Sequence, residues 1–202
     1  MAYLKYPAYP LMPEEIKQEI FDVVAKSENT RLDTLLISSS EEILNLVENA
    51  YDPNINKSKL GYSGQEARER FPGLVKYSFI DVSDTISKWV NTHIPIKYDS
   101  INIQVMEEGS IIPPHIDELR SKAYNYLIQT GGDVSLIFYE LNDYKDNTWI
   151  HPQMFIPYDK VTKKEEIKVP LDRWHLLPAN KIHSVENINP GSKRISLTLS
   201  VI

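Results

Sequence analysis

The feature that most constrains the fold is a change in the spacing of apolar residues near residue 95. From Ile101 onward, apolar residues alternate with polar ones or form short runs, in the segments INIQVM, YNYLI, VSLIFYE, EEIKVP, RWHLL, HSVENI and RISLTLSVI. Turn-forming stretches such as EEGS, TGGD, LPAN and NPGS separate these segments. Many short strands without helical spacing between them are typical of an antiparallel sandwich or a small barrel.

The first part of the chain has helical spacing instead. Pro13 suits the first position of a helix, and the apolar residues after it recur at helical intervals, as do those of EEILNLVENA and SDTISKWVNTHI. We therefore expect a mainly β protein with supporting α-helices, in which residues 1–95 form a helical support packed on one sheet and residues 96–202 form the β core. A chain of 202 residues is long enough for one compact domain, and we expect a single one.

Charge and composition limit the classes of partner that we expect the protein to bind. The net charge is −6 and acidic residues interrupt the basic ones, as in EARER and KKEE, so no basic stripe is available for a run of phosphates. This disfavours nucleic acid. No segment reaches the roughly 18 uninterrupted apolar residues of a membrane helix. The N-terminus lacks the pattern of a secretory signal and the chain has no cysteine, so we expect a cytoplasmic protein without a membrane partner.

The last predicted strand has two different faces. Its apolar residues fall on one face and its polar residues on the other, and the two sets are Ile195, Leu197, Leu199 and Val201, and Arg194, Ser196, Thr198 and Ser200. The apolar face is expected to pack in the core. A polar row inside a barrel is expected where the strand lines a wet cavity that holds a charged small molecule.

One pair of residues and one distant histidine could bind a metal. His115 and Asp117 are two positions apart, so on extended chain their side chains project to the same side. His183 begins a predicted strand after a turn and could supply a third ligand. Two imidazoles and one carboxylate on one side of an ion form the facial triad that selects Fe(II) and leaves positions open for a co-substrate and O2.

A 2-oxoacid co-substrate would need a cation for its distal carboxylate. Arg194, on the polar face of the last strand, has a planar guanidinium suited to bidentate carboxylate binding, and Ser196 is next on that face. Lys193 is the competing cation. By strand parity it should point with Ile195 into the apolar layer.

The order of HID, YNYLIQTGGD and HSVENINPGSKRISLTLS resembles the signature of Fe(II)- and 2-oxoglutarate-dependent dioxygenases, particularly their prolyl-hydroxylase-like branch, over about residues 100–202. The resemblance implies a double-stranded β-helix, or jelly roll. It implies iron held by His115, Asp117 and His183, with 2-oxoglutarate and O2 as co-substrates. The expected reaction is hydroxylation of an amino acid, a prolyl peptide or another small substrate, with release of succinate and CO2.

The resemblance also assigns the co-substrate contacts. The distal carboxylate of 2-oxoglutarate would pair with Arg194, and a tyrosine on the strand after the first two ligands would hydrogen-bond to it. Tyr126 fits best, with Tyr124 on the same face as the reserve. The sequence departs from the family pattern at Met106, which occupies a position where related hydroxylases often have a tyrosine.

Other readings stay open. The main alternative is a cupin-like metal-binding isomerase or small-ligand-binding protein without oxygen chemistry, although cupins usually have His-x-His where this chain has His-x-Asp. Arg120 or Lys122 could attract a carboxylate-bearing substrate. The polar, aromatic segment 141–160 could form a lid, with Tyr144 and Trp149 as substrate contacts. We expect structural roles for the three other histidines, which are His93, His151 and His175.

Overall fold

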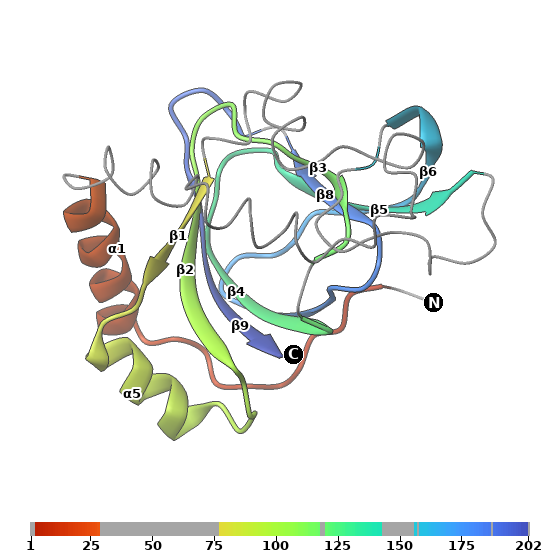
Figure 1. Ribbon diagram of the computed structural model, residues 1–202. Coiled ribbons are helices and arrows are strands. Elements are labelled where there is room, and N and C mark those ends of the chain that lie inside the picture. Colours follow the sequence, from red (N-terminus) through yellow and green to blue (C-terminus); the bar gives the residue numbers. More distant parts are fainter. Residues whose placement is uncertain are drawn as a thin grey trace, which may run out of the picture.

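The computed structural model describes residues 3–28, 77–117, 120–142, 156, 158–186 and 188–201. Its strands form two antiparallel sheets, one with the order β1-β2-β9-β4-β7 and one with the order β3-β8-β5-β6 (Figure 1). The elements are α1 (Glu14–Glu28), β1 (Tyr77–Asp81), α5 (Asp84–His93), β2 (Ser100–Met106), β3 (Ile112–His115), β4 (Lys122–Thr130), β5 (Ser135–Leu141), η4 (Tyr158–Lys160), β6 (Val161–Ile167), β7 (Trp174–Pro178), β8 (His183–Glu186) and β9 (Arg194–Val201).

The strand pairing is nested. The second strand pairs with the ninth, the third with the eighth, the fourth with the seventh and the fifth with the sixth, all antiparallel. This nested order, divided between two facing sheets, is the topology of an eight-stranded jelly roll, or double-stranded β-helix. The predicted fold class is therefore confirmed. The additional strand β1 extends the larger sheet at the edge beside β2.

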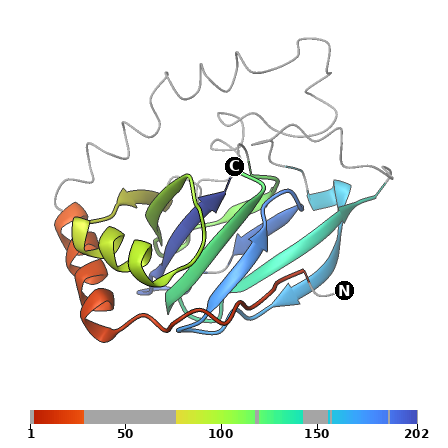
Figure 2. The ribbon, with the colours of Figure 1, turned by 90° about the horizontal axis from the view of Figure 1, so that it is seen from below.

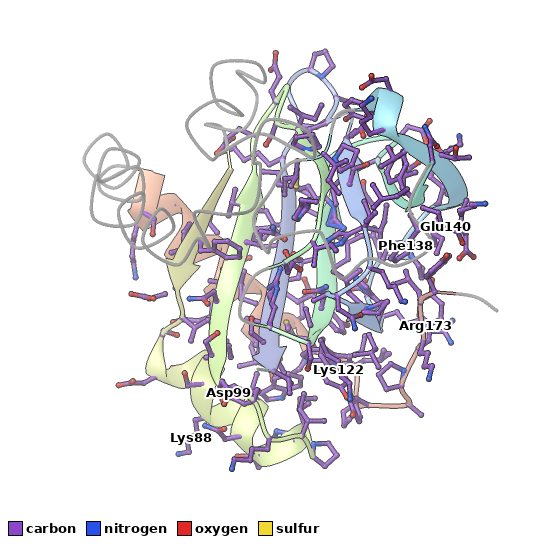
Figure 3. The ribbon with its side chains drawn as sticks, turned by 45° about the vertical axis from the view of Figure 1, so that its right-hand side comes forward. Lys88, Asp99, Lys122, Phe138, Glu140 and Arg173 are labelled. Carbon is purple, nitrogen blue, oxygen red and sulfur yellow. The ribbon has the colours of Figure 1, made fainter. Side chains whose placement is uncertain are left out.

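Both described helices cover the outer face of the larger sheet (Figure 2). The buried side chains Ile20 of α1 and Ile86 of α5 belong to the same apolar cluster as the apolar face of β9. The hydroxyl oxygen of Ser83 caps α5 by accepting a hydrogen bond from the backbone N–H of Ile86. In Figure 3, Lys88 of α5 and Glu140 of β5 lie on opposite sides of the molecule. Neither helix in the described part of the chain is long and apolar enough to cross a membrane.

Three elements differ from the sequence expectation. Strand β1 lies inside the region expected to be helical. Strand β3 contains Pro113 and Pro114, which lack the N–H of a ladder hydrogen bond; β3 can carry them because it is the edge strand of its sheet. Strand β6 starts at Val161, ahead of the expected EEIKVP segment, because this edge strand is mostly charged and gives no apolar signal. The predicted helix EEILNLVENA lies outside the described residues.

An N-terminal strap, residues 3–12, runs along the open edge of β7 (Figure 2). Lys5 and Leu176 exchange two backbone hydrogen bonds, and the indole N–H of Trp174 donates to the carbonyl of Pro10. Leu4 enters the apolar cluster between the sheets, which also contains Leu127 and Phe138. The strap thus covers a sheet edge and fills part of the barrel interior.

The strap should contribute measurably to stability. Leu4 is 5% exposed and Leu11 is 69% exposed, so the two residues form a matched pair. Leu4→Ala should lower the free energy of unfolding by about 2–4 kcal/mol because it leaves a cavity between the sheets. Leu11→Ala should change it by less than about 0.5 kcal/mol. Urea unfolding followed by circular dichroism measures both values, and equal effects in the two variants would contradict the assigned role of the strap.

Candidate metal centre

Strand register brings the two predicted histidine ligands together. His115 ends β3, His183 begins β8, and the two residues are directly opposite one another in the antiparallel pair. Their ring centroids are 4.4 Å apart. Asp117 lies just beyond β3, where its backbone N–H donates to the carbonyl of Ala179. One ligand atom from each of His115, Asp117 and His183 lies within 4.8 Å of the others, so the three side chains could hold a metal ion.

Backbone carbonyls orient both imidazole rings. The Nδ1 atom of His115 lies 2.8 Å from the carbonyl oxygen of Pro113, and the Nδ1 atom of His183 lies 2.8 Å from that of Lys181. A carbonyl oxygen can only accept, so each Nδ1 carries a proton, and in the neutral form of each ring the lone pair for a metal is on Nε2. These Nε2 atoms lie 3.3 Å and 3.6 Å from the carboxylate oxygens of Asp117. The donor set therefore fits a divalent metal ion.

The electrostatics of the site favour the protonation states that bind metal. Burial alone raises the pKa of Asp117, but His183, His115 and Arg120 outweigh this effect and hold the pKa well below its usual value. The pKa of His183 is lowered to about 4, first by burial and then by the neighbouring His115. An anionic carboxylate and a neutral imidazole are thus present together at neutral pH.

Arg120 binds the candidate ligand carboxylate. Its Nε and Nη2 atoms lie 2.9 Å and 2.8 Å from Oδ2 of Asp117, and its Nη1 atom donates to the hydroxyl of Ser200 at 3.3 Å. These contacts direct Oδ2 toward Arg120 and leave Oδ1 beside His115. The guanidinium that was expected to attract a substrate carboxylate is therefore engaged by the carboxylate of Asp117. Lys122 is exposed at the outer end of β4 (Figure 3).

Arg194 is a buried cation in the interior of the same barrel. The residue is 7% exposed, and burial lowers the pKa of its guanidinium to about 10. No hydrogen-bond or ion-pair partner is found for it among the residues that the structure describes. Its stem packs closely against Gly131, where an added Cβ would come within 2.9 Å of the Cβ of Arg194. An unpaired buried charge is strongly destabilising, so a buried guanidinium is normally paired with an anionic group.

Ser196 lies on the same inner face as Arg194. It is opposite Gln104 on β2, and its hydroxyl donates to the side-chain carbonyl of Gln104 at 3.5 Å. Lys193, expected in the apolar layer, instead precedes β9 and pairs with Glu107 at the surface at 3.6 Å. That expectation was wrong because residue 193 lies outside the strand, so strand parity does not apply to it.

The predicted tyrosine contacts are wrong. Tyr126 is directly opposite Leu197, and Tyr124 is directly opposite Leu199, so both tyrosines lie on the helix-covered face of the larger sheet. The hydroxyl of Tyr126 accepts a hydrogen bond from the backbone N–H of Met12 at 3.1 Å. The inner face of β4 carries Asn125 instead. The sequence did hold a signal for this, because the aromatic residues of YNYLI alternate with the polar one.

Sequence analysis missed a second group of inner-face residues. His175 is 1% exposed and was assigned only a structural role, yet it is directly opposite Asn125, which is directly opposite Thr198. Within the described residues, no hydrogen-bond partner is found for its buried Nδ1 atom or for the buried hydroxyl of Thr198. The alternation of RWHLL could have placed His175 inside the barrel. Tyr144 and Trp149, the proposed lid contacts, lie outside the described residues.

No family model matches the chain, and no curated protein matches it. Solved structures similar to it include ycfD of E. coli, with a TM-score of 0.36, 10% identity, and coverage of 52% of this chain and 25% of that chain. A cupin superfamily protein from Desulfitobacterium hafniense matches with a TM-score of 0.31, 12% identity, and coverage of 53% and 72%. Hydroquinone 1,2-dioxygenase PnpCD matches with a TM-score of 0.33, 14% identity, and coverage of 50% and 58%.

Two histidines provide a test of the metal centre. His183→Gln should weaken Mn(II) or Zn(II) binding by more than about 100-fold. Removing a residue that hydrogen-bonds to a metal ligand typically lowers metal affinity by about 10- to 100-fold, and removing the ligand itself should lower it more. His93→Gln, at the exposed end of α5, is the control and should leave affinity unchanged. Competition with a chromophoric chelator measures both. Metal binding by His183→Gln at the original affinity would remove that residue from the ligand set.

His175 should make the free energy of unfolding depend on pH in the acidic range. Burial, and then the charge of Arg194, lower the pKa of His175 to about 3. As the pH falls from about 6.5 toward 3, the unfolded chain binds a proton that the folded chain does not, so the free energy of unfolding decreases. His175→Asn should make this decrease shallower by up to roughly 1.4 kcal/mol per pH unit. Urea unfolding of metal-free protein between about pH 7 and pH 5 tests this, and parallel curves would contradict it.

Proposed function

We propose that this protein is an Fe(II)- and 2-oxoglutarate-dependent dioxygenase that hydroxylates a small substrate. The observation that carries the proposal is the combination of two sites in one barrel. A buried His-Asp-His group that could bind metal shares the barrel with a buried arginine that has no partner among the described residues. A metal site alone would suit many jelly-roll proteins. The unpaired cation adds a reason to expect a dicarboxylate co-substrate.

The proposed reaction converts a substrate C–H bond, 2-oxoglutarate and O2 into a substrate C–OH group, succinate and CO2. Bound Fe(II) would supply the oxygen chemistry, in which 2-oxoglutarate is oxidatively decarboxylated and the C–H bond is oxidised. His115, Asp117 and His183 would hold the ion from one side and leave the other side open. Arg120 would keep the carboxylate of Asp117 in position through its two contacts with Oδ2.

Arg194 would bind the distal carboxylate of 2-oxoglutarate. Its guanidinium matches a carboxylate with two parallel hydrogen bonds, and the low-dielectric interior strengthens that pairing. Ser196, next on the inner face of β9, would lie beside the co-substrate. The inner face therefore offers a cation at one end of β9, while Ser200 at the other end contacts Arg120 of the metal site.

The proposed substrate is an amino acid, a prolyl peptide or another small molecule. The net charge of −6 and the interleaved basic residues support a small substrate over nucleic acid. We place the reaction in the cytoplasm. A screen of amino acids and prolyl peptides for stimulated succinate release would identify the substrate class.

A spectroscopic experiment tests the assignment. Anaerobic addition of Fe(II) and 2-oxoglutarate should give a weak metal-to-ligand charge-transfer band in the visible, because the 2-oxoacid chelates the iron. Protein that binds Fe(II) but gives no band would favour the alternative, a cupin-like metalloprotein without oxygen chemistry. Asp117→Ala should abolish substrate-stimulated succinate release while circular dichroism shows that the fold remains. Normal turnover by that variant would exclude Asp117 as a ligand.

Arg194 and Lys193 form a matched pair for the co-substrate. Arg194→Gln should raise the Kd for 2-oxoglutarate by roughly 100-fold, because it removes one partner of a buried charge pair. Lys193→Gln removes a neighbouring cation that pairs with Glu107 at the surface, and it should leave this Kd unchanged. Titration of the charge-transfer band gives both values. Equal affinity in the wild type and Arg194→Gln would exclude Arg194 from the co-substrate site.

A further inference from the structure

Four polar side chains form a row across the inner face of the larger sheet. Asn102 of β2 is directly opposite Thr198 of β9, Thr198 is directly opposite Asn125 of β4, and Asn125 is directly opposite His175 of β7. Thr198 and His175 are 3% and 1% exposed. The row lies on the same face as Arg194, four residues from it along β9, so it belongs to the interior in which the guanidinium is buried.

Two members of this row have a buried polar atom for which no well-aligned hydrogen-bond partner is found among the described residues, although the nearby backbone of Arg173 raises the pKa of the His175 ring slightly. In the described part of the chain, the buried side-chain atoms without a partner are the hydroxyl of Ser110, Nδ1 of His175 and the hydroxyl of Thr198. Buried polar atoms are normally paired, because leaving one unpaired costs its full desolvation penalty. Two such atoms in one row therefore indicate a polar group that binds between β9 and β7.

The positive charge of Arg194 indicates that the bound group is negatively charged. Burial lowers the pKa of the His175 imidazole, and the positive charge of Arg194 lowers it further. His175 is therefore neutral at neutral pH, yet a neutral imidazole still has one N–H donor. A cation, a hydroxyl and an imidazole N–H on the inner face of one sheet form a set of donors that suits an anion.

A carboxylate needs more donors than an arginine supplies. Its two oxygens offer about four lone-pair positions, and a bidentate guanidinium fills two of them. The other two would be left unpaired in a buried site. The Thr198 hydroxyl and the His175 ring can supply the missing hydrogen bonds, and the carboxylate would in turn satisfy the unpaired atoms of the row.

We propose that His175 and Thr198 bind the distal carboxylate of the co-substrate together with Arg194, and that they determine selectivity for a 2-oxo dicarboxylate over a 2-oxo monocarboxylate. This inference rests on the proposed function, because it assumes that a 2-oxoacid binds at the metal centre. It adds two specificity-determining residues, from β7 and β9, to the pair Arg194 and Ser196.

The test measures binding without turnover. Protein loaded with Zn(II), which has no redox chemistry, is titrated with 2-oxoglutarate and with 2-oxobutyrate in a calorimeter. Thr198→Val and His175→Leu remove the hydrogen-bonding groups at nearly constant volume, and Thr198→Ser and His175→Gln retain them. Tyr126→Phe is the control, because it removes a buried hydroxyl from the opposite face of the same sheet. Circular dichroism checks that each variant is folded.

The expected result is a change for one ligand only. Thr198→Val and His175→Leu should each raise the Kd for 2-oxoglutarate on the order of tenfold, as expected for the loss of a hydrogen bond to a charged group. They should leave the Kd for 2-oxobutyrate unchanged. Thr198→Ser, His175→Gln and Tyr126→Phe should bind both ligands like the wild type. A ring-nitrogen NMR shift of His175 should appear with 2-oxoglutarate and not with 2-oxobutyrate.

Two outcomes would overturn the inference and leave the proposed function intact. One is an unchanged Kd for 2-oxoglutarate in Thr198→Val and His175→Leu while Arg194→Gln loses affinity, which would mean that the row holds water. The other is an equal loss for both ligands, which would mean that the substitutions disturb the pocket. If the wild type binds the two ligands equally and Arg194→Gln changes neither, the proposed function fails together with the inference.

Discussion

The alternation of apolar and polar side chains along β9 is the constraint on which the rest of the structure depends. One face packs Ile195, Leu197 and Leu199 against the two helices, and this apolar layer holds the larger sheet in place. The opposite face must then point Arg194, Ser196, Thr198 and Ser200 between the sheets, because successive side chains alternate. A shift of one residue in register would bury the polar set under the helices and point the apolar set into the space between the sheets. The same pattern thus specifies both the core and the polar interior.

The polar groups between the sheets lower the stability of the folded protein. The space between the sheets contains a buried guanidinium without a partner in the described residues, two unpaired polar atoms and a histidine kept neutral by its surroundings. A protein selected only for stability would fill such positions with apolar side chains. Strained or unsatisfied positions are expected at functional sites, where a ligand supplies the missing interactions. Apart from the hydroxyl of Ser110, which lies in the turn after β2, these groups share the inner face of one sheet, and this supports a binding site there.

Local patterns predicted the elements whose residues alternate or recur regularly, including α1, α5, β2, β5 and β9. They also predicted the three residues His115, Asp117 and His183 that the structure brings together. Local patterns failed where the position of a strand in its sheet, or its pairing with another strand, decides the structure. Strand β3 tolerates two prolines only because it is an edge strand, and the face of Tyr126 follows from its position opposite Leu197. That Arg194 has no partner among the described residues could not be predicted at all, because it depends on every element packed around it.

The nested strand order has a kinetic consequence. The innermost pair, β5 with β6, joins segments close in the sequence, whereas the outermost pair joins β2 to β9 near the end of the chain. Closing the larger loops costs more chain entropy and is repaid only when the long-range contacts form. His115 and His183 meet in the second-outermost pair, so the complete ligand set exists only late in folding. A metal ion therefore has no complete set of ligands until β3 and β8 have paired.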